Sequence, residues 1–488
     1  MSPLPAISNH LEAHARFQPD AEALFDVESG RRFTWSQLHD LARRWTARLL
    51  SRGVQPGDRV AVLAHNRAET FAVLYACASA GATLFPMNWR LAPAELAWQL
   101  DHARPKLILV GPAFRDTLNR PTEPLDIDPD EDPATGPGSS LDDAWQLLYT
   151  SGTSGRPKGA LLTHRQVHWN AVNTVLACKI STTSSTLTCT PLFHTGGLNC
   201  LSTPLFFAGG RVVLTRGVEP HRDLALIAEE RITHLMGVPT IYEMWADDPA
   251  FEQSDLSCVE DALCGGAPLS VDLLQRYLDR DLPLRQGFGM TEVGPNCFAM
   301  PHEDQPRKLG SVGKTIHHMA MRLVRPDGTD CDDDEPGELW LAGPTTFAGY
   351  LDNPEATAKS FEGPWFRSGD MLTRDSEGFY RVVGRQKEMF ISGGENVYPA
   401  EVEAVIYQLS GVAQCAVLGV GDERWGEVGH AFVEPRHGIT LTEDQLKAHL
   451  KERLARFKIP KHWTIDPELP RTGAGKIDKQ ALKARAGA

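Results

Sequence analysis

The sequence predicts an α/β fold, in which a large N-terminal domain of mixed or parallel sheets flanked by helices precedes a small α+β C-terminal domain. Strand-like and helix-like apolar segments alternate over the first 110 residues, and this alternation is typical of a largely parallel sheet. A loop rich in Gly, Ser and Thr lies between two apolar segments close to residue 150. Residues 388–488 carry strand and helix patterns of their own, which predict a second, smaller core.

The hydrophobic spacing gives the order of the elements. Segments with helical spacing are 11–16, 35–51, 69–80, 402–409 and 442–457. Segments that read as strands are 59–64, 106–110, 145–149, 337–343, 378–387 and 413–420. Residues 120–141 are rich in Pro, Asp and Gly, so we expect an exposed excursion there, just before the Gly-rich loop.

The composition restricts the class of protein. The chain has 488 residues, of which 42% are hydrophobic and 23% are charged, as in ordinary globular proteins of more than one domain. The net charge of −14 disfavours non-specific binding to nucleic acids and to anionic membranes. We expect no membrane span and no secretion signal, because the required apolar runs are absent from the sequence. Nine scattered cysteines argue against a disulfide framework and favour the cytoplasm.

The Gly-rich loop is the first candidate binding segment. Its backbone N–H groups, hydroxyls and positive charge are suited to phosphate oxygens, and the residues concerned are Thr150, Ser151, Gly152, Thr153, Ser154, Gly155 and Lys158. A Walker A sequence is excluded, because Pro157 and Ala160 stand where that motif needs its second glycine. A flexible linker is the alternative, but linkers seldom lie between two apolar segments.

Two further segments carry side chains suited to a nucleotide. In 286–292, Gln-Gly-Phe-Gly-Met-Thr-Glu, the ring of Phe288 could stack on adenine and the hydroxyl of Thr291 could reach a phosphate. Glu292 offers a hard oxygen ligand for Mg²⁺, although a surface salt bridge is the alternative for this residue taken alone. Asp370 suits the two hydroxyls of a ribose.

Glycine pairs mark the places where a substrate could approach the backbone. In 191–199, Pro-Leu-Phe-His-Thr-Gly-Gly-Leu-Asn, two glycines follow His194, for which a structural role in a turn is the alternative. The pair in 262–268 leaves space for a flat ligand. Near the C-terminal end, Lys476 stands on a Gly-flanked loop from which it could act as a mobile point charge, unless the segment is only a solvated basic tail.

In this order, the segments resemble the signature motifs of the adenylate-forming superfamily, which includes acyl-CoA and aryl-CoA ligases, firefly-type luciferases and the adenylation domains of peptide synthetases. The resemblance covers nearly the whole chain, and the order of the motifs makes it specific. It implies an N-terminal domain over 1–386 that holds ATP and the acid. A mobile C-terminal domain over 387–488 would rotate about a hinge at Lys387.

The resemblance also implies roles for individual residues. The catalytic residues would be Lys476, Glu292, Thr150 and His194. Besides the loop residues given above, ATP or AMP would contact Gly265, Gly266, Ala267, Gln286, Gly287, Phe288, Gly289, Thr291, Asp370, Arg385 and Lys476. The acyl pocket would be lined by His194, Thr195, Gly196, Gly197, Gly265, Gly289 and Met290. Gly393 and Gly394 would border the tunnel for the CoA thiol, and Glu292 would bind the metal.

The reaction that the resemblance implies is the AMP-forming ligation of a small carboxylic acid to CoA. The carboxylate attacks the α-phosphorus of ATP, with Mg²⁺, to give acyl-AMP and pyrophosphate, and the CoA thiol then displaces AMP. No covalent enzyme intermediate is needed. The small 195–197 segment favours a medium- or long-chain fatty acid, and an aryl acid is the alternative.

Three other activities stay open at this point. An adenylating enzyme could load a carrier protein in place of CoA. A luciferase-like oxygenase would share every nucleotide residue. A non-catalytic nucleotide-binding regulator could lose Lys476 or Glu292, and the presence of both residues argues against it. A homodimer is compatible with the sequence.

Overall fold

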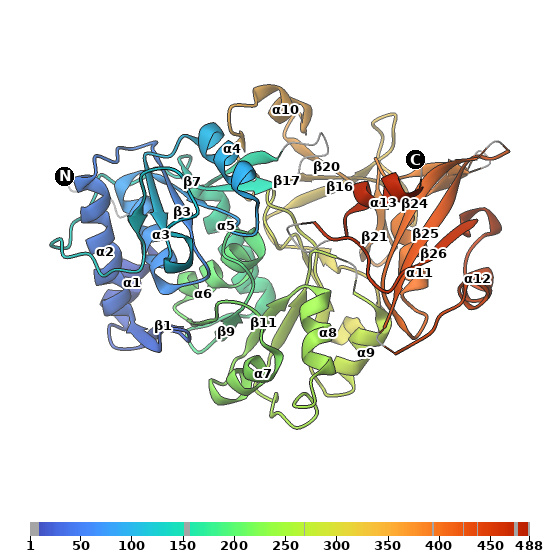
Figure 1. Ribbon diagram of the computed structural model, residues 1–488, viewed down its shortest axis with the longest axis horizontal. Coiled ribbons are helices and arrows are strands. Elements are labelled where there is room, and N and C mark those ends of the chain that lie inside the picture. Colours follow the sequence, from blue (N-terminus) through green and yellow to red (C-terminus); the bar gives the residue numbers. More distant parts are fainter. Residues whose placement is uncertain are drawn as a thin grey trace.

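The computed structural model describes residues 9–150, 157–267, 269–392, 395–422, 424–436, 438–472 and 477–486. The N-terminal part contains large sheets with helices against their faces, and a smaller C-terminal part, orange to red at the right of Figure 1, has a sheet of its own. This architecture confirms the predicted α/β fold class with a second, smaller α+β domain.

Within the described ranges, the first sheet has seven strands in the order β18-β8-β7-β4-β3-β5-β6. The strands are β3 (Arg59–Leu63), β4 (Thr83–Pro86), β5 (Leu107–Val110), β6 (Glu123–Pro124), β7 (Ala144–Thr150), β8 (Lys158–Thr163) and β18 (Gly349–Tyr350). β3, β4, β5, β6 and β7 are parallel, whereas β8 runs antiparallel to β7 and to β18. The sheet is therefore mixed at the edge that carries the Gly-rich loop.

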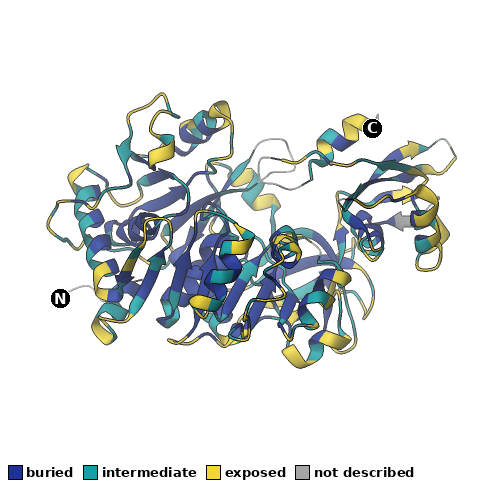
Figure 2. Ribbon diagram, turned by 60° about the horizontal axis from the view of Figure 1, so that its bottom comes forward, coloured by how far each residue is buried: buried dark blue, intermediate teal, exposed yellow. Residues whose placement is uncertain are grey.

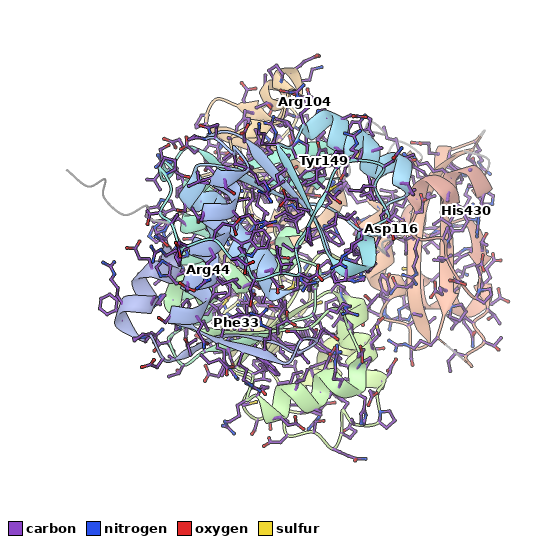
Figure 3. All side chains as sticks on the ribbon, turned by 60° about the vertical axis from the view of Figure 1, so that its left-hand side comes forward. Phe33, Arg44, Arg104, Asp116, Tyr149 and His430 are labelled. Atoms are coloured by element: carbon purple, nitrogen blue, oxygen red, sulfur yellow. The ribbon has the colours of Figure 1, made fainter. Side chains whose placement is uncertain are left out.

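The side chain of Tyr149 fixes the end of β7 against helix α4 (Pro93–Ala103). Its hydroxyl lies 2.7 Å from Nδ1 of His102, and its ring packs on Phe85 and Trp98. Figure 3 labels Tyr149 among the side chains of the N-terminal part. These contacts hold β7 up to the residue that precedes Thr150.

A second sheet, also seven-stranded in the described part of the chain, has the order β13-β12-β11-β9-β10-β1-β2. Its strands are β1 (Glu22–Asp26), β2 (Arg31–Thr34), β9 (Ser185–Thr188), β10 (Arg211–Leu214), β11 (His234–Gly237), β12 (Asp261–Cys264) and β13 (Leu284–Gln286). Every pair is parallel except β1 with β2. Because the carboxyl ends of parallel strands share one edge, the loops after β9, β12 and β13 lie on the same side.

An antiparallel third sheet follows in the sequence. It joins β16 (Ala320–Val324), β17 (Gly337–Ala342), β19 (Phe361–Glu362), β20 (Trp365–Arg374) and β21 (Tyr380–Arg385), and β14 (Phe298–Ala299) pairs with β15 (Lys314–Thr315) beside it. A turn over residues 386–388 links β21 to the first strand of the C-terminal sheet. The predicted hinge residue, Lys387, lies in that turn.

Helices cover the N-terminal sheets. They are α1 (His10–Phe17), α2 (Trp35–Ser51), α3 (Ala68–Ala80), α4, α5 (His164–Cys178), α6 (Ser202–Ala208), α7 (Pro220–Glu229), α8 (Pro239–Asp247), α9 (Val271–Leu278) and α10 (Pro354–Lys359). The expected helices at 11–16, 35–51 and 69–80 are confirmed to within one or two residues at each end. A capping box between Thr34 and Gln37 begins α2. Figure 2 shows the strands as the buried centre, under helices whose outer turns are exposed.

The C-terminal sheet joins β22 (Phe390–Ser392), β23 (Glu395–Val397), β24 (Val412–Asp422), β25 (Gly426–Pro435) and β26 (His462–Ile465). Helices α11 (Pro399–Ile406), α12 (Glu443–Lys451) and α13 (Lys479–Ala486) accompany it. A separate core of buried side chains, which includes Phe390, Val402, Ile406 and Leu446, holds this part together.

The structure changes the bounds of two predicted helices of this region. The helix expected over 402–409, with Pro399 near its start, runs over Pro399–Ile406, so the position of Pro399 is confirmed and the helix ends three residues earlier. The helix expected over 442–457 ends at Lys451, because the chain turns so that Leu454 and Ile459 stay packed on the C-terminal core. In the parts of the chain that the structure describes, no helix has the length and apolar character that a bilayer crossing requires.

Candidate active site

Strands β7 and β8 bring Thr150 and Lys158 opposite each other at the two ends of the Gly-rich loop. The two residues are register partners in the antiparallel pair, and the Thr150 hydroxyl lies 3.5 Å from the Lys158 carbonyl oxygen. The predicted residues Ser151, Gly152, Thr153, Ser154 and Gly155 lie outside the described residues. The described ends of the loop thus place one hydroxyl and one ammonium at the edge of the first sheet.

The carboxylate of Glu292 faces this strand pair. Its Oε1 atom accepts a hydrogen bond from the Tyr350 hydroxyl at 2.9 Å and lies 3.5 Å from the Thr150 hydroxyl. The ammonium of Lys158 is 4.7 Å from the centre of the Tyr350 ring, a cation–π distance. Burial, and then the charge of Glu292, raises the pKa of Tyr350, so this phenol stays a hydrogen-bond donor.

Sequence reasoning did not find Tyr350. The residue belongs to β18, which joins the first sheet beside β8 although it is far from Glu292 in the sequence. Only the paired register of β18 and β8, Tyr350 opposite Ala160, brings the phenol to the site. No local sequence signal marks such a contact, because it depends on strand pairing over a long separation.

Asp370 is a buried carboxylate with one unused acceptor. It stands opposite Arg385 in the β20–β21 pair, and the Nε atom of Arg385 is 2.8 Å from Oδ1 of Asp370. The residue is 4% exposed, and Oδ2 has no hydrogen-bond partner among the described residues. Burial raises the pKa of Asp370 to about 6, although the guanidinium of Arg385 opposes the shift. Hydroxyl donors of a ligand would satisfy Oδ2, so this carboxylate fits a ribose.

The loops after β12 and β13 are tied together by Gln286. Its amide donates to the carbonyl oxygen of Ala267 at 3.2 Å and accepts from the N–H of Leu269 at 2.6 Å. A Cβ atom on Gly265 would meet no other atom within 4 Å, so this backbone borders open space. Gly266 has φ +82°, a left-handed conformation that favours glycine.

The segment after β13 turns sharply to place Phe288, Thr291 and Glu292. A Cβ atom on Gly289 would lie 2.1 Å from the carbonyl oxygen of Pro295, so only glycine fits there. The N–H of Met290 donates to the carbonyl oxygen of Gly294 at 3.0 Å and closes the turn. The ring of Phe288 packs edge-on against Phe298 with the centres 5.6 Å apart. Gly287 donates its N–H to the carbonyl oxygen of Cys264 at 2.6 Å.

The segment with Gly196 and Gly197 forms a short π-helix over Gly196–Cys200, an unusual element that often marks functional sites. A Cβ atom on Gly197 would lie 2.3 Å from the carbonyl oxygen of Pro191, so the turn needs glycine there. His194 is half-buried, and its ring centre is 4.6 Å from that of Phe193. The Thr195 hydroxyl accepts a hydrogen bond from the side-chain amide of Asn199 at 3.3 Å.

The predicted C-terminal site residues Lys476, Gly393 and Gly394 lie outside the described residues. The chain on either side of residues 473–476 is fixed: Arg471 and Ile477 form an antiparallel bridge, and the N–H of Asp478 donates to the carbonyl oxygen of Pro470 at 2.7 Å. The side chain of Asp478 accepts from the N–H groups of Gln480 and Ala481 at 3.0 Å at the start of α13.

An exposed aromatic patch on the C-terminal sheet was not predicted from the sequence. Trp425, in the turn between β24 and β25, is 40% exposed. The charged ends of Arg424 and Lys461 lie 5.0 and 4.9 Å from its ring. An exposed ring with a cation on either side is suited to stacking on a base.

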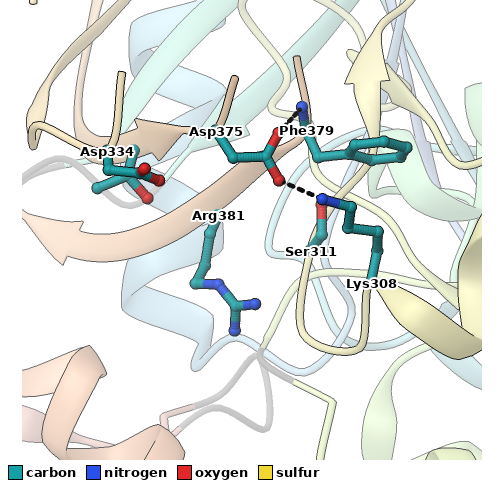
Figure 4. A pocket seen from close by; sticks show the side chains of 7 residues that line it. Lys308, Ser311, Asp334, Asp375, Phe379 and Arg381 are labelled. Carbon is teal, nitrogen blue, oxygen red and sulfur yellow. Dashed lines mark hydrogen bonds and ion pairs between the residues drawn. The ribbon is translucent and has the colours of Figure 1, made fainter. Parts of the chain in front are cut away.

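A small polar pocket lies apart from these residues, between the 308–311 segment and strands β20 and β21 (Figure 4). Its lining contains both signs of charge, with the ammonium of Lys308 2.6 Å from Asp375 and from Glu377. The ammonium of Lys308 is therefore already paired with two carboxylates, and none of the predicted ATP-binding residues that the structure describes lines this pocket.

Comparison with known proteins shows the family to which this chain is related. Residues 11–351 match the family model of the AMP-binding enzyme, and residues 401–476 match its C-terminal domain. A feruloyl-CoA synthase from Amycolatopsis sp. is 40% identical over 97% of both chains. An indoleacetate–CoA ligase from Aromatoleum aromaticum is 37% identical over 98% of this chain and 97% of the relative.

Among solved structures, the o-succinylbenzoate CoA synthetase of Bacillus subtilis in complex with its acyl-adenylate intermediate superposes with a TM-score of 0.88. The two sequences are 29% identical, and the alignment covers 97% of this chain and 98% of that one. The chain therefore belongs to the AMP-binding enzyme family, in the CoA-ligase branch of the adenylate-forming superfamily. Its activity class is that of an AMP-forming acid–CoA ligase.

Proposed function

We propose that this enzyme joins an aryl or arylalkyl carboxylic acid to CoA through an acyl-adenylate. One observation carries the adenylating step: the hydroxyls of Thr150 and Tyr350 meet the carboxylate of Glu292, and the ammonium of Lys158 lies beside the Tyr350 ring. The choice of acid rests on relatives named for ferulate, indoleacetate and o-succinylbenzoate. They favour the aryl acid that the sequence left as the alternative over the fatty acid that it favoured.

Among the described residues, three would contact the phosphates of ATP, and a fourth would bind the metal. Thr150 and the ammonium of Lys158 would contact the phosphates that leave as pyrophosphate, and Thr291 would supply a second hydroxyl. Glu292 would hold Mg²⁺, whose charge offsets the negative charge that develops at the phosphates. A solved structure of the Bacillus subtilis relative contains ATP and a magnesium ion, which supports this assignment.

On the nucleoside side, Asp370 would accept hydrogen bonds from the ribose hydroxyls through its unused oxygen. The guanidinium of Arg385 keeps the carboxylate oriented at 2.8 Å. Adenine would lie between the ring of Phe288 and the open backbone at Gly265–Ala267, which Gln286 holds in place. Gly287 and Gly289 let the chain turn sharply beside the nucleotide.

On the acid side, His194 and the backbone of Thr195, Gly196 and Gly197 would border the acyl pocket with Gly265, Gly289 and Met290. His194 precedes the π-helix, so a small shift of this turn would change the width of the pocket. We call His194 and the following π-helix the acyl gate. The ring contact between Phe193 and His194 gives this gate an aromatic side, which an aryl acid could pack against.

We propose domains over 1–386 and 387–488 with the hinge at Lys387. The turn at residues 386–388 supports this division, because the third sheet ends before it and the C-terminal sheet begins after it. Rotation about the turn would bring Lys476 to the α-phosphate for the first step. For the second step, it would replace Lys476 by Gly393 and Gly394 beside the CoA thiol.

The patch of Trp425, Arg424 and Lys461 is a suitable place for the nucleotide end of CoA. The ring offers a stacking face to adenine, and the two cations offer partners to its phosphates. Lys461 also lies 3.5 Å from the carboxylate of Asp422, so Arg424 would be the main partner of the phosphates.

The experiment that tests the proposal is ATP–pyrophosphate exchange over a panel of acids, followed by detection of the thioester with CoA. The panel contains ferulate, indoleacetate and 2-succinylbenzoate beside fatty acids of medium and long chain. We expect the highest kcat/KM with an aromatic acid. A clear preference for a fatty acid would reject the acid class, and exchange without thioester formation would point to a carrier-protein acceptor.

A further inference from the structure

Four buried amide side chains connect the predicted subsites through helix α5. Gln146, Gln166, Asn170 and Asn199 are at most 2% exposed. Gln166 and Asn170 stand one helical turn apart on α5, which lies at the centre of Figure 1 between β7 and β11. Gln146 lies on β7, the strand that ends at Thr150, and Asn199 lies in the π-helix after His194.

The first connection holds the turn that carries Glu292. The amide of Gln166 donates to the carbonyl oxygen of Thr291 at 2.9 Å. Gly294 allows the same turn to approach α5 closely, because a Cβ atom there would lie 3.0 Å from Oδ1 of Asn170. The main chain next to the proposed metal ligand is therefore held by a side chain that would touch neither metal nor substrate.

The second connection holds the acyl gate. The amide of Asn170 donates to the carbonyl oxygen of Asn199 at 2.8 Å inside the π-helix. The side chain of Asn199 exchanges two hydrogen bonds with that of Gln146, at 2.7 and 3.1 Å. The gate is thus joined to α5 on one side and to the strand of the phosphate loop on the other.

Stability alone does not account for these amides. Oε1 of Gln166 and Oδ1 of Asn170 are buried and have no hydrogen-bond partner among the described residues. A buried acceptor without a partner destabilises the folded state, which offsets part of the stability that the donated hydrogen bond contributes. The geometry that the two N–H donors impose on the neighbouring main chain is a reason to keep them.

We propose that Gln166 and Asn170 are positioning residues for acyl-adenylate formation. Gln166 sets the place of Thr291 and Glu292, and Asn170 sets the place of the turn after His194. The inference rests on the proposed function, because it assumes that Glu292 binds the metal and that the π-helix borders the acid. It assigns the two halves of the site to two different side chains of one helix.

The test compares Gln166→Met and Asn170→Leu with the control Asn173→Leu. Asn173 is a buried amide on the same helix, but its side chain pairs with His318, which belongs to no predicted subsite. We expect Gln166→Met to lower kcat for acyl-AMP formation about 10-fold or more, and to raise the Mg²⁺ concentration for half-maximal rate several-fold. We expect Asn170→Leu to raise the KM of the acid about 5-fold or more with the Mg²⁺ requirement unchanged.

The control variant should lose thermal stability without either kinetic change. Should Gln166→Met fail to fold, Gln166→Asn replaces it, since it keeps an amide that no longer reaches Thr291. The inference is overturned if the Gln166 variant keeps both the wild-type kcat and the wild-type Mg²⁺ requirement. It is also overturned if Asn173→Leu shows the kinetic changes expected of the other two variants. Glu292→Gln is titrated in parallel. If Glu292→Gln also keeps the wild-type requirement, the proposed metal role has failed, and the kcat of Gln166→Met relative to Asn173→Leu decides the inference.

Discussion

Replacement of Asp370 by an asparagine should make the enzyme more stable and, at the same time, worse at binding ATP. Asp370 is buried, and its folded pKa of about 6 is raised from 3.8 by burial. A carboxyl group with a raised pKa favours the folded state only when it is protonated. The contribution of Asp370 to the free energy of unfolding is fully present below pH 3.8, falls as the pH rises towards 6, and is lost above pH 6.

The magnitude follows from the shift. The roughly two pKa units correspond to about 3 kcal/mol of unfolding free energy at pH 7.5. The amide of the Asp370→Asn variant cannot ionise, so the variant escapes this penalty. Arg385 is half exposed and keeps water as a partner, so we expect a net gain of about 1–3 kcal/mol. The gain should shrink to about half at pH 5.

Urea unfolding of the wild type and of Asp370→Asn at pH 7.5 and pH 5 measures the change in stability. The KM for ATP measures the change in binding. An amide that replaces the carboxylate weakens the hydrogen bonds from ribose, so we expect the KM for ATP to rise about 10-fold. AMP should also raise the melting temperature of the wild type more than that of the variant. A variant with unchanged stability and unchanged ATP binding would refute both the buried-charge argument and the ribose assignment.

Other variants test separate parts of the site. Tyr350→Phe keeps the ring beside Lys158 but removes the hydrogen bond to Glu292, so kcat for acyl-AMP formation should fall about 10-fold with an unchanged KM for the acid. Lys476→Ala should reduce acyl-AMP formation by several orders of magnitude and thioester formation from supplied acyl-AMP much less; equal losses would contradict the two-state assignment. His164 is buried with a pKa lowered by burial to about 4, so its own contribution to stability should fall by about 2 kcal/mol between pH 7 and pH 5; urea unfolding should therefore show that His164→Phe loses about 2 kcal/mol less than the wild type over this range.

The sequence predicts best what depends on local spacing. The α2 helix was predicted over its full range, 35–51, because apolar positions recur at helical spacing. Its cap, Thr34, is seen only in the structure. The segments around Glu292 and Asp370 were located by their resemblance to motifs of the adenylate-forming superfamily, each of which is a short run of residue types. These features lie within one continuous stretch of sequence, so the spacing and type of the residues are enough to find them.

The features that sequence reasoning missed all depend on distant pairing. Tyr350 reaches Glu292 only because β18 pairs with β8. The π-helix at Gly196 cannot be read from residue types, because its geometry depends on contacts from α5 and β7. The end of α12 at Lys451 was missed for a related reason, since packing on the C-terminal core, and not a Gly or Pro, ends that helix.

The topology explains why this site can hold two reactants that repel each other. Thr150 is the last residue of β7 in the first sheet, whereas the turn with His194 and the π-helix, which would border the acid, follows β9 in the second. The carboxyl ends of parallel strands are where ligands bind in open α/β sheets, so each sheet can present one reactant from its own edge. The network of Gln146, Asn199 and α5 crosses between the two edges, so the distance between the phosphates and the acid would be set by a rigid, buried element and not by the mobile C-terminal domain. The hinge would then control only whether Lys476, or Gly393 and Gly394 with the CoA thiol, reaches reactants that are already aligned.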